Sequence, residues 1–171
     1  MLRWTHLAVA AIIQVVAFSA VTALDPGRYT IGRGNLFLIP GTRSGDVMAT
    51  MAGQNVPVWI LNSDTASTGA ETAETLYTFQ FEAAVDPKRY MSYNDPAAAE
   101  TSILTKPISH PFRLQLVNIE KRVYRILPPP PENNLVIRGG GEGALFAKFG
   151  VVDNTIITEQ DNDMWTFTPV V

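Results

Sequence analysis

The sequence predicts an all-β fold built from three similar units of about four strands each. Segments rich in aromatic and β-branched residues alternate with polar positions along most of the chain, a period-two pattern typical of strands. Clusters of Gly, Pro, Asn and Asp separate these segments, as turns between strands require. Two short aromatic sequence motifs, called words below, also recur three times each, which indicates internal repeats.

The alternating segments define the expected strands in order. They are RYTIG at 28–32, NLFLI at 35–39, VWIL at 58–61, LYTFQF at 76–81, FRLQLV at 112–117, VYRIL at 123–127, NLVIRG at 134–139 and MWTFTPV at 164–170. Residues 96–104 have a faintly helical composition, but no apolar stripe at helical spacing follows Pro96. We therefore expect a loop followed by a short strand in this stretch, with a helix as the alternative.

The repeated words assign the strands to units. A Tyr two residues before Ile or Phe opens each unit, and a Trp or Phe two residues before Leu or Phe closes it. The opening words begin at Tyr29, Tyr77 and Tyr124, and the closing words begin at Trp59, Phe112 and Trp165. Each word recurs after about 50 residues, a period typical of repeat architectures.

Three units of four short strands predict a β-trefoil, a six-stranded barrel closed at one end by three hairpins. The expected units span about 24–62, 76–117 and 123–171 of a single domain at 24–171. Closure of the barrel removes exposed strand edges, so we expect a monomer. The strand spacing alone also allows a β-sandwich, and the threefold recurrence of the words favours the trefoil over that alternative.

Residues 1–23 predict a signal peptide. Arg3 precedes a long apolar run, and Val21 and Ala23 suit signal peptidase, so the mature chain is expected to begin at Leu24. The alternative is a membrane anchor, because the run is nearly long enough to span about 30 Å of hydrocarbon. No basic flank follows the run, so we expect a secreted, extracellular protein with no membrane attachment after cleavage.

The composition excludes several classes of function. The chain has 16 acidic and 13 basic residues and a formal net charge of −3, so it lacks the basic balance of a nucleic-acid-binding protein. It has no Cys and 2 His, so the core must hold the fold without disulfides and a multi-histidine metal site is excluded. We expect neither a cofactor nor a metal.

The residues also give no catalytic set. His110 is the single imidazole after the leader, it lies directly before Pro111, and no Cys is available as a nucleophile. A Ser–His–Asp arrangement would therefore depend on one awkwardly placed base. We expect a protein that is not an enzyme and has no catalytic residue.

The opening LDPGRYTIG at 24–32, together with the closing aromatic words, resembles small fungal β-trefoil protease inhibitors of the cnispin type and, more distantly, the mycocypins. The resemblance covers the repeat skeleton across 24–171. It implies a β-trefoil that blocks a protease through an exposed loop. The signal peptide and the insertions ASTGAETAET and PPPPENN depart from that pattern.

The candidate protease-contact loop is PGTRSGD at 40–46, with Thr42, Arg43 and Ser44 as its contact residues. It joins the expected second and third strands of the first unit. An exposed Arg43 would suit the acidic primary pocket of a trypsin-like serine protease, and a rigid scaffold lowers the ordering cost of binding. A cysteine protease is the alternative target, and the alternative role for Arg43 is an ordinary solvated cation.

Two other functions remain open. A β-trefoil can bind glycans as a lectin does, with an aromatic ring under the sugar and polar groups at its hydroxyls. The Gln-x-Trp word of ricin-type lectins is missing before Trp59, Phe112 and Trp165, so these aromatics are expected in the core. Tyr90 and Tyr93, beside Asn94 and Asp95, are the candidate surface aromatics. A secreted effector or interaction protein is the third alternative.

Overall fold

The computed structural model describes residues 23–42, 45–52, 56–66, 74–84, 86–132, 134–139, 146–152 and 162–171. These residues form twelve β-strands. The first four are β1 (Gly27–Arg33), β2 (Leu36–Ile39), β3 (Ala49–Ala52) and β4 (Trp59–Ala66). They are followed by β5 (Glu74–Phe81), β6 (Arg89–Ser92), β7 (Leu104–Lys106) and β8 (Arg113–Asn118). The last four are β9 (Val123–Leu127), β10 (Leu135–Arg138), β11 (Lys148–Val151) and β12 (Trp165–Pro169).

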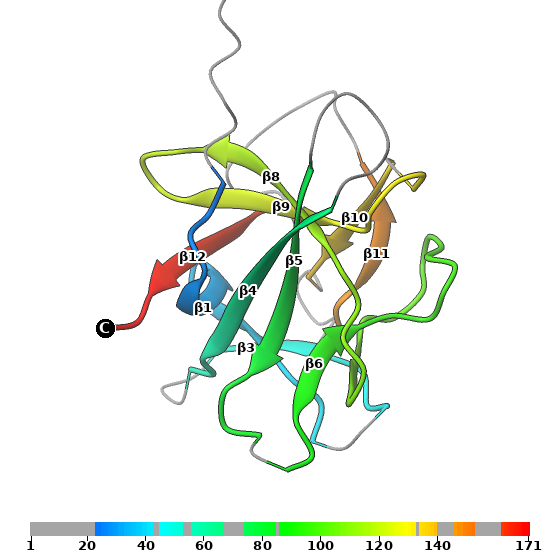
Figure 1. Cartoon of the computed structure of the whole chain (residues 1–171), viewed down its shortest axis with the longest axis horizontal. Helices are drawn as coiled ribbons and strands as arrows, with labels where there is room; N and C mark the ends of the chain where they lie inside the picture. The colour runs from blue at the N-terminus through cyan, green and yellow to red at the C-terminus, as the bar shows by residue number, and fades with distance from the viewer. Residues whose placement is uncertain are drawn as a thin grey trace, which may run out of the picture.

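Six strands close into a barrel, in the order β1, β4, β5, β8, β9 and β12. Five of the six seams are antiparallel ladders. The sixth, between β5 and β8, is made by Tyr77 and Phe112, which exchange backbone hydrogen bonds of 2.8 Å in both directions. The seam between β1 and β12 joins the first strand to the last, so the barrel has no free edge. Figure 1 shows these two strands side by side and β8 and β9 crossing beside them.

The opening and closing words of each unit face one another across a barrel seam. Tyr29 is paired with Trp59, Tyr77 with Phe112, and Tyr124 with Trp165. All six side chains are buried. The recurrence in the sequence therefore corresponds to three equivalent contacts in space, one in each unit.

Three hairpins cover one end of the barrel. They are β2 with β3, β6 with β7, and β10 with β11. The hairpins are joined in a ring of backbone hydrogen bonds, because Met48 N donates to Ile103 O, Ile103 N to Ala147 O, and Ala147 N to Met48 O, at 2.8 to 2.9 Å. Each hairpin thus donates to one neighbour and accepts from the other. This ring marks the threefold axis.

The architecture is the expected β-trefoil, with four strands in each of three units, and the sandwich alternative is wrong. The core lies inside the barrel and under the hairpins, where Trp59, Trp165, Phe79, Phe112, Phe149 and Phe167 are almost fully buried. Phe79 contacts Phe112 edge to face, with ring centroids 5.6 Å apart, a favourable arrangement of aromatic quadrupoles. No disulfide is needed to hold these elements together.

The sequence prediction gave no bounds for four short strands: β3, β6, β7 and β11. They have three or four residues each, and Ala, Ser, Lys and Gly interrupt their apolar pattern. The stretch at 96–104 forms no helix and leads into β7 at Leu104, as the favoured reading expected. Short hairpin strands take their conformation from the neighbouring units, so their own sequence carries little signal.

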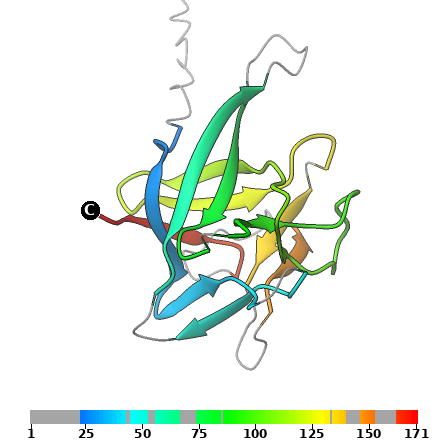
Figure 2. The ribbon, with the colours of Figure 1, turned by 60° about the horizontal axis from the view of Figure 1, so that its bottom comes forward.

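The hairpin of β4 and β5 extends past the open end of the barrel. Gly27 at the start of β1 pairs with Leu61, so β4 continues alone with β5 from Asn62 onward. Figure 2 shows this arm at the end of the barrel where β1 begins. No helix in the described ranges is long and apolar enough to span a membrane.

Candidate functional site

The predicted contact loop lies where the sequence placed it, between β2 and β3. Thr42 is exposed, whereas Arg43 and Ser44 lie outside the described residues. Arg89 donates hydrogen bonds to the backbone oxygens of Gly41 and Thr42, and Thr105 Oγ1 accepts one of 2.8 Å from Gly41 N. The second unit therefore holds the residues that precede Arg43.

The residues after Ser44 are held in the same way. Gly45 N donates to Thr105 O at 2.6 Å, and Thr105 N donates to Asp46 O at 2.9 Å. A Cβ atom at Gly41 would lie 2.2 Å from that of Asp46, so the two sides of the loop approach too closely for any larger residue. The loop has a narrow base anchored on both sides.

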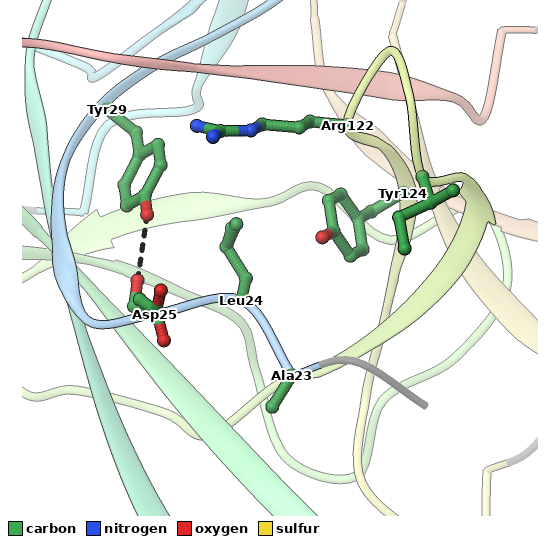
Figure 3. A pocket seen from close by; sticks show the side chains of 7 residues that line it. Ala23, Leu24, Asp25, Tyr29, Arg122 and Tyr124 are labelled. Carbon is green, nitrogen blue, oxygen red and sulfur yellow. Dashed lines mark hydrogen bonds between the residues drawn. The ribbon is translucent and has the colours of Figure 1, made fainter. Parts of the chain in front are cut away.

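A pocket of about 190 Å³ opens at the end of the barrel opposite the hairpins. It is lined by Ala23, Leu24, Asp25, Tyr29, Ile119, Arg122 and Tyr124. Leu24 is 7% exposed and forms the apolar floor. In Figure 3 the two tyrosine rings face each other across Leu24, and the Arg122 side chain runs above it between them.

Three equivalent tyrosines surround this end of the barrel, because each opens its unit at the same level. The Tyr29 hydroxyl donates to Asp25 O at 2.9 Å, and the backbone of Leu24 lies close enough to the Tyr77 hydroxyl to lower its pKa against the larger effect of burial. The residues that precede β1 are thereby fixed across the mouth. Ile119 and Arg122 come from the turn between β8 and β9, which lies beside them.

The three tyrosine hydroxyls at this end of the barrel are protonated at neutral pH. Burial raises the pKa of Tyr29, Tyr77 and Tyr124 above the ordinary value. The positive charge of Arg122 lowers the pKa of Tyr29 and Tyr124 and so opposes this effect, while Asp25 adds to it. The pocket thus combines neutral hydroxyls, which both donate and accept hydrogen bonds, with one cation and one anion.

His110 makes a close contact of a kind seen in hydrolases. Its Nδ1 lies 2.6 Å from Ser92 Oγ, but Ser92 is 0% exposed. Burial first, and Lys106 second, lower the pKa of His110. A hydroxyl without access to solvent cannot reach a substrate, so the contact serves the core between β6 and β8.

The two candidate surface aromatics, Tyr90 and Tyr93, differ in how far they are buried. Tyr93 is 4% exposed and packs against His110, Phe112 and Phe149, and burial raises its pKa to about 12. The expectation that Tyr93 lies on the surface and could stack on a sugar is wrong, because its ring is part of the core. Tyr90 is half-buried. Within the described ranges, no group of three or more His, Asp or Glu side chains could hold a metal ion.

Sequence reasoning missed the pocket residues Leu24, Asp25 and Arg122. The threefold recurrence of the Tyr words contained part of the signal, since equivalent strand starts must meet at one end of a barrel. The remaining residues belong to the segment directly before β1 and to a turn nearly 100 residues away in sequence. Their proximity depends on barrel closure, which no local pattern records.

Comparison with known proteins supports the fold. No protein-family model and no curated protein matches the chain. Nine chains of solved structure match. One is a ricin B-like lectin of Macrolepiota procera in complex with lactose, which has 13% sequence identity and a TM-score of 0.60 over 87% of this chain and 100% of that chain. At this identity the likeness shows a shared β-trefoil fold.

Proposed function

We propose that this protein is a secreted, non-enzymatic β-trefoil that binds a carbohydrate in the pocket at the open end of its barrel. The observation that carries the proposal is the lining of that pocket, where aromatic rings, hydroxyls, a carboxylate and a guanidinium surround an apolar floor. A sugar ring presents both apolar C–H faces and hydroxyls, and such mixed surfaces bind both.

The size of the pocket limits the ligand. Its volume of about 190 Å³ is below the roughly 300 to 1,000 Å³ of sites for drug-sized molecules. It therefore suits one ring at the end of a glycan rather than a long segment. The solved lectin of the same fold was in complex with lactose, which supports a saccharide as the class of ligand.

A glycan array with the purified protein tests the proposal. We expect binding to a defined set of terminal sugars, and Asp25→Asn should weaken it about tenfold by removing a charged acceptor at the rim. Asp86→Asn, which alters an exposed carboxylate on a different loop, serves as the matched control and should bind as the wild type does. An array without any bound glycan would rule the proposal out.

Protease inhibition is the second candidate, supported by the anchored base of the loop at 40–46. Hydrogen bonds from Arg89 and Thr105 on either side of Arg43 and Ser44 would lower the ordering cost of presenting these residues to a protease. The target would be a trypsin-like serine protease, with a cysteine protease as the alternative.

Residual-activity assays with trypsin, chymotrypsin, subtilisin and papain test this second candidate. We expect micromolar protein to inhibit trypsin and Arg43→Ala to abolish the inhibition. Lys88→Ala, which removes an exposed cation from another loop, should leave it unchanged. Full activity of all four proteases would exclude this function.

A further inference from the structure

We infer that the pocket at the open end of the barrel prefers a saccharide that carries a carboxylate, and that Arg122 is the residue that sets this preference. The inference rests on the proposed carbohydrate binding and adds the chemical class of the ligand. It follows from the position of Arg122, from the distribution of charge around the pocket and from the backbone conformation of that residue.

The position of the guanidinium favours such a ligand. Arg122 extends from the turn after β8 across the pocket, above Leu24 and between the rings of Tyr29 and Tyr124 (Figure 3). A ligand resting on Leu24 would lie under this guanidinium. Arginine presents a planar fork of N–H donors that matches a carboxylate in two parallel hydrogen bonds.

The charges around the pocket also favour a sugar acid. Among the side chains that line the pocket, Arg122 is the single cation and Asp25 is the single anion. The charge of Arg122 acts on both tyrosine hydroxyls, and so does that of Asp25. A sugar acid can satisfy both ends, with its carboxylate at Arg122 and its hydroxyls donating to Asp25. A neutral sugar leaves the guanidinium without a charged partner.

The backbone of the turn between β8 and β9 also points to a role for the Arg122 side chain. Arg122 has φ of 51°, in the left-handed region that is unfavourable for a residue with a side chain. The turn is held by Asn118 Oδ1, which accepts from Lys121 N at 3.0 Å, and by Arg122 O, which accepts from Phe167 N at 3.0 Å. Glycine would adopt this conformation without strain. An arginine at this position is explained by what its side chain does.

Titration by protein NMR with matched pairs of sugars tests the inference. The probes are D-glucuronic acid against its methyl ester, and D-galacturonic acid against its methyl ester. We expect at least one acid to bind about fivefold more tightly than its ester, the size expected for an ion pair at an exposed guanidinium. The preference should shrink as sodium chloride rises from 50 to 500 mM, because salt screens such a pair.

Variants assign the preference to Arg122. Arg122→Gln should bring each acid and its ester to equal affinity, while Lys88→Gln, a control of the same charge change, should keep the wild-type preference. Arg122→Gly should also abolish the preference, yet its midpoint of urea unfolding should equal or exceed that of the wild type, because the left-handed strain is relieved. That combination separates loss of recognition from loss of folding.

The results that overturn the inference differ from those that overturn the proposed function. Equal binding of acids and esters by the wild type, or a preference that survives in Arg122→Gln, would disprove the role of Arg122 while leaving carbohydrate binding intact. Absence of binding by every acid and ester, together with an empty glycan array, would remove both.

Discussion

At the scale of single residues, the buried aromatics that close the units have two tasks. Trp59 Nε1 donates to Leu38 O, and Trp165 Nε1 donates to Ile137 O, each at 3.0 Å. Each indole therefore fills the core and also satisfies a carbonyl of the hairpin above it. Phe112 occupies the equivalent place in the second unit and has no such donor. Trp165 thus joins the barrel of the third unit to its cap.

Replacement of Trp165 should reveal both tasks. Trp165→Ala should lower the free energy of unfolding by about 3 to 5 kcal/mol, the usual cost of removing a large buried ring. Trp165→Phe should cost less, because the second unit tolerates Phe in this place. Urea unfolding followed by far-UV circular dichroism measures the change. Ile108→Ala, at a side chain that is 67% exposed, is the control, and a loss at Trp165 no larger than at Ile108 would contradict the assignment.

His110 should make stability depend on pH. Its pKa is lower in the folded protein, chiefly through burial, so the unfolded chain binds the proton more readily. Stability is then complete above the unfolded pKa of about 6.5 and decreases as pH falls through that value. Urea midpoints measured between pH 8 and pH 5.5 should fall less in His110→Gln than in the wild type. Parallel pH profiles of the two proteins would show that His110 is not responsible.

At the scale of elements, the third unit contains a buried ion pair. Arg125 Nε on β9 lies 3.3 Å from Asp163 Oδ2, just before β12, and the two side chains are 3% and 5% exposed. The pair connects the two barrel strands of that unit. The exposed pair of Arg28 and Glu82 joins β1 to the residue after β5, and water competes with it.

These two pairs should differ sharply on mutation. Asp163→Asn should lower the free energy of unfolding by about 3 to 5 kcal/mol, because it removes the negative charge that lies beside the buried guanidinium of Arg125. Glu82→Gln should leave stability close to that of the wild type, since exposed pairs contribute little. Urea unfolding of both variants at low and high salt makes the comparison. Similar losses at the two sites would refute this distinction.

At the scale of the whole molecule, the closed barrel and the ring of hairpins make each unit depend on the other two. Every barrel seam between units is a strand pairing, and Met48, Ile103 and Ala147 share one cycle of hydrogen bonds. No unit keeps a complete core by itself. The molecule should therefore unfold as one cooperative body.

Coincident transitions check this cooperativity. Tryptophan fluorescence reports mainly on the first and third units, where Trp59 and Trp165 lie, while far-UV circular dichroism reports on all strands. The two probes should give the same urea midpoint and slope. Separate midpoints would mean that the units unfold independently.

The sequence predicted more of this molecule than of its site. The repeated words at Tyr29 and Trp59 predicted a trefoil because they mark core positions that recur in all units. Short strands such as β6 were missed, since their conformation depends on hydrogen bonds to other units. The pocket was also missed, because Asp25 and Arg122 meet only through the seam that β12 makes with β1 and β9. Whether Thr42, Arg43 and Ser44 contact a protease stays a prediction.

The seam between β1 and β12 also brings the two ends of the described domain together. The backbone of Val170 donates a hydrogen bond of 2.9 Å to Arg28 O, so the start and the end of the described domain lie against each other. The order in which the three units are translated is therefore not dictated by the architecture. A circular permutant with residue 171 linked to residue 24 through a few glycines, and with new termini between β4 and β5, should fold to the same barrel. The position of the chain ends in the closed barrel can therefore change while the fold stays the same.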